Sequence, residues 1–175
     1  MEFFSLFYQV GVYGQDLFYH LKGWNNGMGN FVAADNQFPT IFLVTFLSTL
    51  LVFVVYYYIL NHPRFNKFWQ WLIAMAILFV GIFLYSRGLV MSDLSGVSAH
   101  PIDPTLNVSA DNATMFGVYN GLLASVLFFV LSLLFRFGSK NCKNTPFKSL
   151  INRKELWQSY TYLELVAQDP EPFVP

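Results

Sequence analysis

Long uninterrupted runs of apolar residues dominate the pattern along this chain. Three such runs, at positions 41–60, 68–86 and 115–135, contain no Asp, Glu, Lys, Arg or His. A helix needs about 20 residues to cross roughly 30 Å of hydrocarbon, because each residue adds only about 1.5 Å. A soluble chain of 175 residues could not cover three such helices without charges on their solvent faces. The pattern therefore predicts an all-α integral membrane protein with three transmembrane helices.

The segment before the first run has a weaker periodicity, which predicts an amphipathic helix over residues 1–22. Its apolar residues recur at helical spacing, whereas most of its polar residues fall on the other side. The segment is too short and too polar to span a bilayer. We expect it to lie in the membrane interface, with its apolar face in lipid or against the other helices. Gly11 and Gly14 argue against one continuous helix, and the composition of residues 23–39 predicts a loop.

Basic residues gather on one side of the predicted spans. The 61–67 turn carries two and the segment after the third span carries six, so eight of the ten Lys and Arg residues share a side. Cytoplasmic segments carry an excess of Lys and Arg. The pattern thus predicts an integral protein of the cytoplasmic (plasma) membrane with its N-terminus and its 87–114 loop outside. The C-terminal tail, residues 138–175, would be cytoplasmic.

The third run contains a stripe of small residues. Gly117, Gly121 and Ser125 are four residues apart, with Ala124 beside them. This spacing places them on one helix face, where a neighbouring backbone can approach closely. The stripe predicts a helix contact, either between subunits of a homo-oligomer or within one subunit. Asn120 lies next to it, and its amide is predicted to bond between helices, to line a pore or to be wetted near the interface.

The C-terminal tail combines basic residues with apolar and aromatic ones. Its basic residues predict contact with anionic lipid headgroups, at Lys140, Lys143, Lys148, Arg153 and Lys154. Solvated disordered tails are poor in apolar side chains. The apolar and aromatic residues of this tail therefore predict docking onto a partner protein, through Leu156, Trp157, Tyr160 and Leu163. A proline-rich end at 169–175 favours docking, because a proline-restricted segment loses little entropy on binding.

Composition argues against several classes of function. The formal net charge is zero, so the chain is not expected to bind nucleic acid electrostatically. Its histidines, His20, His62 and His100, lie in different segments and have no neighbours at metal-ligand spacing. Ion-coupled transporters generally need an ionisable group inside the membrane, and the three runs have none. We therefore expect a protein that is not an enzyme, with no catalytic residue, metal or cofactor.

Two hypotheses of function remain. The first is a polytopic membrane scaffold or anchor subunit that self-associates and holds a partner through its cytoplasmic tail. The alternative is an oligomeric pore or channel, or a membrane-disrupting effector, in which uncharged spans surround a passage gated by apolar side chains. In both, the expected partners are the lipid bilayer and further copies of the chain. The scaffold would in addition bind a cytosolic or membrane protein.

Overall fold

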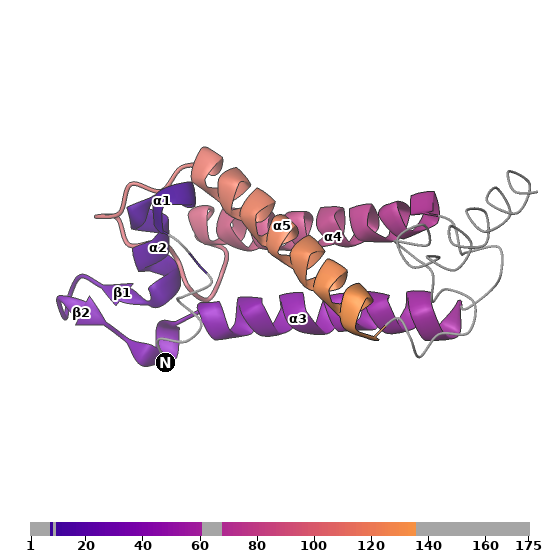
Figure 1. The fold of residues 1–175 in the computed structure, drawn as a ribbon. Coiled ribbons are helices and arrows are strands. Elements are labelled where there is room, and N and C mark those ends of the chain that lie inside the picture. Colours follow the sequence, from indigo (N-terminus) through magenta and orange to yellow (C-terminus); the bar gives the residue numbers. More distant parts are fainter. Residues whose placement is uncertain (1–7, 9, 61–67, 136–175) are drawn as a thin grey trace, which may run out of the picture.

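The computed structural model describes residue 8, residues 10–60 and residues 68–135, and most of this part of the chain is helical (Figure 1). In chain order the elements are α1 (Val10–Tyr13), α2 (Gln15–Lys22), β1 (Trp24–Asn25), β2 (Asn30–Phe31), the 3-10 turn η2 (Ala33–Asp35), α3 (Phe38–Val54), the π-helical turn η3 (Val55–Ile59), α4 (Phe68–Leu94) and α5 (Ala110–Phe135).

Three long helices form the body of the molecule. The stretches Ala33–Ile59, Phe68–Leu94 and Ala110–Phe135 are each long and apolar enough to cross a membrane, so the prediction of a helical membrane protein with three spans is confirmed at this level. Figure 1 shows α3 and α4 running in opposite directions, with α5 crossing obliquely over them. α5 makes its most extensive contact with α4 and a smaller one with α3.

One end of this bundle is covered by residues 10–37 and by the connection between α4 and α5, and we call it the capped end (Figure 1). The predicted amphipathic helix is here two short helices that meet at Gly14, where φ is 97°. A Cβ atom at this position would lie 2.6 Å from Nδ2 of Asn112, so glycine suits both the backbone angle and the space. Leu17 and Leu21 of α2 are fully buried and pack in one cluster with Phe116 of α5. The apolar face of α2 thus lies on the other helices, while a place in the membrane interface stays a prediction.

The spans are longer than the uncharged runs. α4 continues past Ser86 to Leu94, and α5 begins at Ala110 rather than at position 115. The predicted 87–114 loop is therefore reduced to residues 95–109. Charged residues do not end these helices, because the charges find partners beyond the apolar part; Nε of Arg87, for example, donates to Oγ1 of Thr114 over 3.2 Å.

The predicted loop at 23–39 also contains regular structure. β1 and β2 form a short antiparallel hairpin in which Trp24 pairs with Phe31. α3 then begins at Phe38, three residues before the predicted position, with Pro39 in its first turn. Proline is well accommodated there, because the first backbone N–H groups of a helix have no partner within it.

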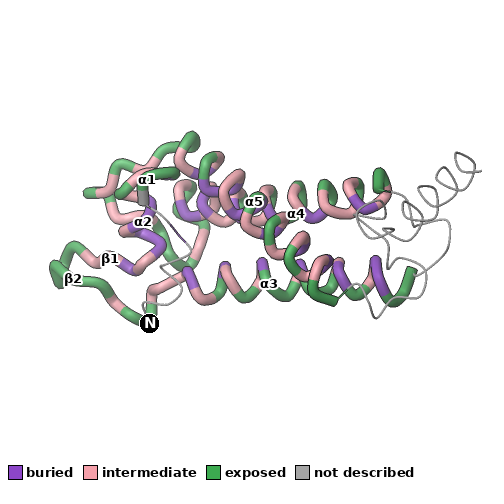
Figure 2. Tube along the Cα trace, in the orientation of Figure 1, coloured by how far each residue is buried: buried purple, intermediate pink, exposed green. Residues whose placement is uncertain are grey.

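Buried residues face the middle of the bundle along all three long helices, as Figure 2 shows. They form two clusters, one at the capped end around Phe38, Val90 and Phe116, and one toward the opposite end around Trp71 and Phe128. The site described next lies between these clusters and at the capped end.

Candidate functional site

Asn120 of α5 is fully buried and joins all three long helices. Its Nδ2 donates to Oγ of Ser86 on α4 over 2.6 Å and to Oγ1 of Thr45 on α3 over 3.1 Å. Its Oδ1 accepts from the hydroxyl of Tyr8 over 3.3 Å. Burial raises the pKa of Tyr8, which keeps this phenol neutral and able to donate. We call these four residues the Asn120 node, and within one chain it bonds helix to helix.

The glycines beside Asn120 face α4 of the same chain. A Cβ on Gly117 would lie 3.0 Å from the carbonyl oxygen of Phe83, and one on Gly121 would lie 3.1 Å from that of Phe79. Both distances are shorter than ordinary van der Waals contact, so the approach of α5 to the α4 backbone depends on glycine. The stripe is thus occupied by α4, and self-association through the same face would require α4 to move aside.

The remaining residues of the stripe play smaller parts. Ala124 is fully buried in the cluster with Phe128. Ser125 is half-buried, and its Oγ donates to the carbonyl of Gly121 in its own helix over 3.0 Å. Because the hydroxyl proton of Ser125 is used within its own helix, this side chain has no proton left to donate to another helix.

A second polar group lies at the capped end, where His20 and Asp93 form a buried pair. Nε2 of His20 is 2.8 Å from Oδ2 of Asp93, and the side chains are 7% and 4% exposed. Nε2 of Gln37, which precedes α3, donates to the same oxygen over 3.2 Å. One carboxylate at the end of α4 thereby holds both α2 and the start of α3.

The sequence pattern does not predict this pair. His20 lies in the predicted amphipathic helix over residues 1–22, and Asp93 lies in the predicted 87–114 loop. Seventy-three positions separate the two residues, and no periodicity connects segments so far apart. The helical continuation of α4 to Leu94 is the one feature that would have moved Asp93 toward the bundle.

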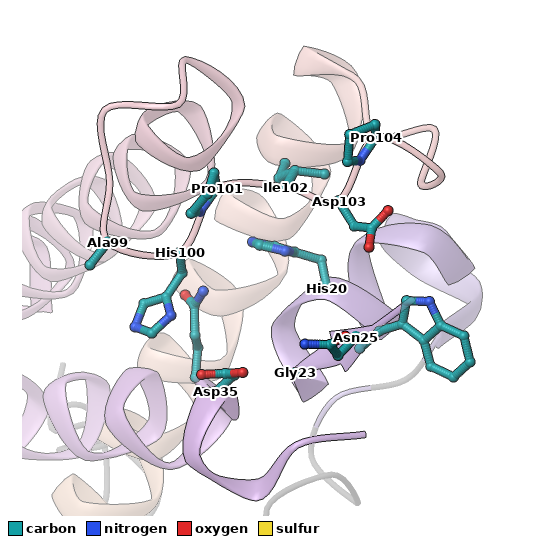
Figure 3. A pocket seen from close by; sticks show the side chains of 12 residues that line it. His20, Gly23, Asn25, Asp35, Ala99, His100, Pro101, Ile102, Asp103 and Pro104 are labelled. Atoms are coloured by element: carbon teal, nitrogen blue, oxygen red, sulfur yellow. The ribbon is translucent and has the colours of Figure 1, made fainter. Parts of the chain in front are cut away.

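A cavity of about 360 Å³ opens beside this pair (Figure 3). Its walls come from α2, from residues 23–25, from the segment before α3, and from residues 99–104 of the α4–α5 connection. His20, Asp35, His100 and Asp103 bring ionisable groups to it. No local pattern predicts this cavity, because its walls belong to segments that lie far apart along the chain.

Asp103 fixes one wall of the cavity. Its Oδ1 accepts from the backbone N–H and the hydroxyl of Thr105, over 2.9 and 2.6 Å, and its Oδ2 accepts from the backbone N–H of Asn26 over 3.3 Å. The hydrogen bonds from Thr105 hold the pKa of Asp103 below its usual value. A further bond joins Oδ2 of Asp16 to the N–H of Asn107 over 3.2 Å. The α4–α5 connection is therefore tied to both α2 and the hairpin.

The polar groups at the capped end can offer hydrogen bonds and negative charge to a ligand. Within residues 8, 10–60 and 68–135, no group of three or more His, Cys, Asp or Glu side chains is placed to hold a metal ion. The predicted headgroup contacts (Lys140, Lys143, Lys148, Arg153 and Lys154) and the predicted docking residues (Leu156, Trp157, Tyr160 and Leu163) lie outside the described residues, as does His62.

No protein-family model matches this chain, and none of the curated proteins or solved structures gives a significant match. The class of the protein comes from its own architecture, which is that of a helical protein with three helices able to span a membrane.

Proposed function

We propose that this chain is a non-enzymatic membrane scaffold or anchor subunit, whose bundle fixes it in the bilayer and whose tail holds a partner protein. The Asn120 node is the observation that supports this proposal most. Both polar atoms of the Asn120 amide are bonded to groups of the same chain. A residue that lines an aqueous pathway would instead keep hydrogen-bonding capacity for water or ions. The Asn120 node is therefore better suited to a bundle that serves as a membrane anchor than to a bundle that conducts ions.

The outward faces of the helices support the same proposal. Each long helix exposes apolar side chains at about four-residue spacing, at Leu43, Leu47 and Leu51 on α3, Ile73 and Ile77 on α4, and Leu122, Val126 and Val130 on α5. Such faces suit acyl chains or the helices of another copy, since neither offers water. The proposal assigns self-association to these faces, because α4 covers the glycine stripe.

The proposed orientation has the capped end outside and the C-terminal tail in the cytoplasm. It rests on the eight basic residues of the 61–67 turn and the tail. A Lys67→Cys variant, made in a chain in which Cys142 is replaced by serine, should react with an impermeant thiol reagent only after the membrane is opened. Labelling of intact cells would reverse the orientation.

The decisive experiment concerns the tail. Deletion of residues 155–175 should leave membrane insertion intact and abolish recovery of a partner in cross-linked membranes. Two full-length variants separate the causes. Replacement of Leu156, Trp157 and Tyr160 by alanine should abolish recovery as well, whereas replacement of Lys140, Lys143 and Lys148 by glutamine should preserve it. Equal recovery with the truncated and the complete chain would refute the scaffold.

The alternative, a pore or membrane-disrupting effector, is tested with the purified chain in liposomes. The scaffold predicts no release of a trapped ion above that of empty liposomes. A chain that conducts, and whose conductance changes in an Asn120→Leu variant, would replace the scaffold by the pore.

A further inference from the structure

Arg87 of α4 is the only Lys or Arg in the three stretches that could span a membrane, all of which the structure describes. Its depth follows from the length of the helix. Trp69, near the start of α4, is 73% exposed, and tryptophan is enriched at membrane–water interfaces. Arg87 lies 18 residues further along α4, which at about 1.5 Å per residue is roughly 27 Å. Because the hydrocarbon is about 30 Å thick, Arg87 reaches the headgroups at the capped end when Trp69 lies at the opposite interface.

Contacts with α5 hold the side chain of Arg87 in place. A Cβ built on Gly117 would lie 3.2 Å from Cβ of Arg87, so the side chain starts out against the glycine stripe. Nε of Arg87 donates to Oγ1 of Thr114 over 3.2 Å, and the Thr114 hydroxyl donates its own proton to the carbonyl of Ala110 over 3.0 Å. Arg87 is half-buried, so its guanidinium is fixed at the edge of the contact between α4 and α5.

Most of the hydrogen-bonding capacity of this guanidinium is unused. A guanidinium has five N–H donors, and within the described residues Arg87 makes one hydrogen bond and no ion pair. Asp93, on the same helix, is bound instead by His20 and Gln37. A cation at the edge of the hydrocarbon requires a partner, because an unpaired charge is costly to remove from water. The geometry leaves room for an anion that can accept several hydrogen bonds.

Exposed apolar side chains continue from Arg87 toward the middle of the bundle. Val80 and Leu84 precede it at helical spacing and share its face of α4, and Leu122 follows Thr114 on the same face of α5. All three apolar side chains are exposed. A charged group and then an apolar surface therefore follow one another along both helices. A phospholipid offers its phosphate and its acyl chains in the same order.

From these features we propose that Arg87, positioned by Thr114, holds the phosphate of a phospholipid in the leaflet at the capped end. Two N–H groups of the guanidinium donate to two phosphate oxygens, because the planar fork of arginine matches the geometry of phosphate. One acyl chain lies along Val80 and Leu84. This inference rests on the proposed placement of the bundle in the bilayer and adds a lipid site to it, and it does not depend on what the tail binds.

The first test measures the contact directly in phosphatidylcholine bilayers. The full-length chain carries Arg64→Lys, Arg136→Lys and Arg153→Lys, so that arginine labelled with ¹³C at Cζ reports Arg87 alone. Solid-state NMR then measures dephasing of this signal by the ³¹P of the lipid. Two N–H···O bonds of about 2.8 Å place Cζ about 4 Å from phosphorus, so strong dephasing is expected. A chain that enters the bilayer without dephasing would overturn the lipid site alone, whereas a chain that stays out of the bilayer would overturn the placement of the bundle as well.

The second test uses two matched variants. Arg87→Gln removes the charge and keeps an N–H group for Thr114. Lys22→Gln removes the other described cation, whose Nζ lies 4.6 Å from the centre of the Phe31 ring. Native mass spectrometry compares the retention of dioleoylphosphatidylcholine with that of dioleoylglycerol, which has the same acyl chains and no phosphate. The phospholipid has no net charge, so basic residues elsewhere in the chain do not attract it strongly.

The unchanged chain should retain the phospholipid in preference to the diacylglycerol. Arg87→Gln should lower retention of the phospholipid by about fivefold or more, as expected for the loss of charged hydrogen bonds, and Lys22→Gln by less than about twofold. Neither variant should change retention of the diacylglycerol. Equal losses in the two variants, or equal retention of the two lipids by the unchanged chain, would overturn the phosphate site.

Discussion

The two ends of the bundle share aromatic packing, which at the capped end includes the Tyr8 and Phe38 rings, but they differ in their polar contacts. At the capped end, directed polar contacts join segments far apart in sequence, as when Asp93 binds His20 and Gln37. Toward the opposite end the contacts are mainly aromatic. Trp71 lies against Phe128 with 5.9 Å between ring centroids, and the π-helical turn η3 brings the consecutive residues Tyr56 and Tyr57 into the core.

This difference indicates different tolerance to change. A buried polar contact stabilises only when its partners are in place, since a group that loses its partner is left without water or a bond. Aromatic packing is less directional and loses its contacts gradually as side chains shift. A single substitution of a polar residue at the capped end should therefore cause a large loss of stability there. A single substitution in the aromatic cluster of the opposite end should cause a smaller loss.

The largest effect is expected at Asp93. An Asp93→Ala variant leaves the buried His20 and the half-buried Gln37 without their acceptor, and removal of one member of a buried pair costs about 3 kcal/mol or more. Residues 10–37 should lose their protection from hydrogen exchange, while the aromatic cluster around Trp71 keeps it. Asp111→Ala, at an exposed position, is the control and should change neither region.

A double variant sharpens this result. His20→Leu together with Asp93→Leu removes both members of the pair and should recover part of the lost stability, because no charge is left unpaired. Unchanged exchange in Asp93→Ala would mean that the pair does not hold the cap, and the contrast between the ends would fail.

The second largest effect on stability is expected at Gly121, where α5 packs against α4 along the length of the bundle. Gly121→Ile introduces a side chain whose Cβ would lie 2.9 Å from the ring of Phe79 and 3.1 Å from its carbonyl oxygen. Overpacking of this kind typically costs about 1–3 kcal/mol. Gly81 of α4 is a matched control, because no atom lies within 4 Å of a Cβ built there. Unfolding in detergent should thus be easier for Gly121→Ile than for Gly81→Ile.

The same pair of variants distinguishes the two uses of the stripe. If copies of the chain associate through the outward faces, Gly121→Ile should lower stability without a selective loss of the oligomer in native mass measurements. An oligomer that dissociates while the monomer keeps its stability would favour the stripe as a contact between subunits.

Features that depend on residues close together in the sequence could be predicted, whereas features that depend on contacts between distant residues could not. The three spans, their order and the close helix face at Gly117 and Gly121 could be predicted, because apolar runs and four-residue spacing are local patterns. The ends of the spans could not, since the charges of Arg87 and Asp93 favour a loop that begins at position 87, whereas α4 continues to Leu94. A helix can continue beyond the hydrocarbon when its charged side chains find partners, and those partners lie far away in the sequence.

The site was predictable in part. Asn120 stands out as a polar residue inside an apolar run, so a role for it could be predicted, although its partners Tyr8, Thr45 and Ser86 could not be chosen among many hydroxyl groups. The capped-end cavity had no local signal at all. The hairpin of β1 and β2 was missed because each strand has only two residues, too few for an alternating pattern.

A smaller effect is expected at Trp71, toward the opposite end. Nε1 of Trp71 donates to Oγ of Ser132 over 3.2 Å, and the side chain is 3% exposed, whereas Trp69 is 73% exposed. Trp71→Phe removes this bond and part of the ring, at a cost of about 0.5–1.5 kcal/mol for the bond. Trp69→Phe should have no measurable effect on unfolding. If Trp71→Phe also exposed residues 10–37 to exchange, the two ends would not be separate units.

The smallest effect concerns pH and the α4–α5 connection. Hydrogen bonds from Thr105 lower the pKa of Asp103, so the ionised carboxylate favours the folded connection. This contribution is present above the unfolded value of about 3.9 and is lost as the pH falls through the lower pKa of the folded state. The amide resonances of Thr105 and Asn26, followed by NMR in nanodiscs, should therefore stay constant from pH 7 to about pH 4 and move together below it. Asp111→Asn should leave this titration unchanged, and Asp103→Asn should remove it. Because Asp103 is solvent-accessible, the change in chemical shift should remain within the α4–α5 connection and the hairpin. Movement of the Asn120 resonances in the same pH range would show instead that the capped end is coupled to the rest of the bundle.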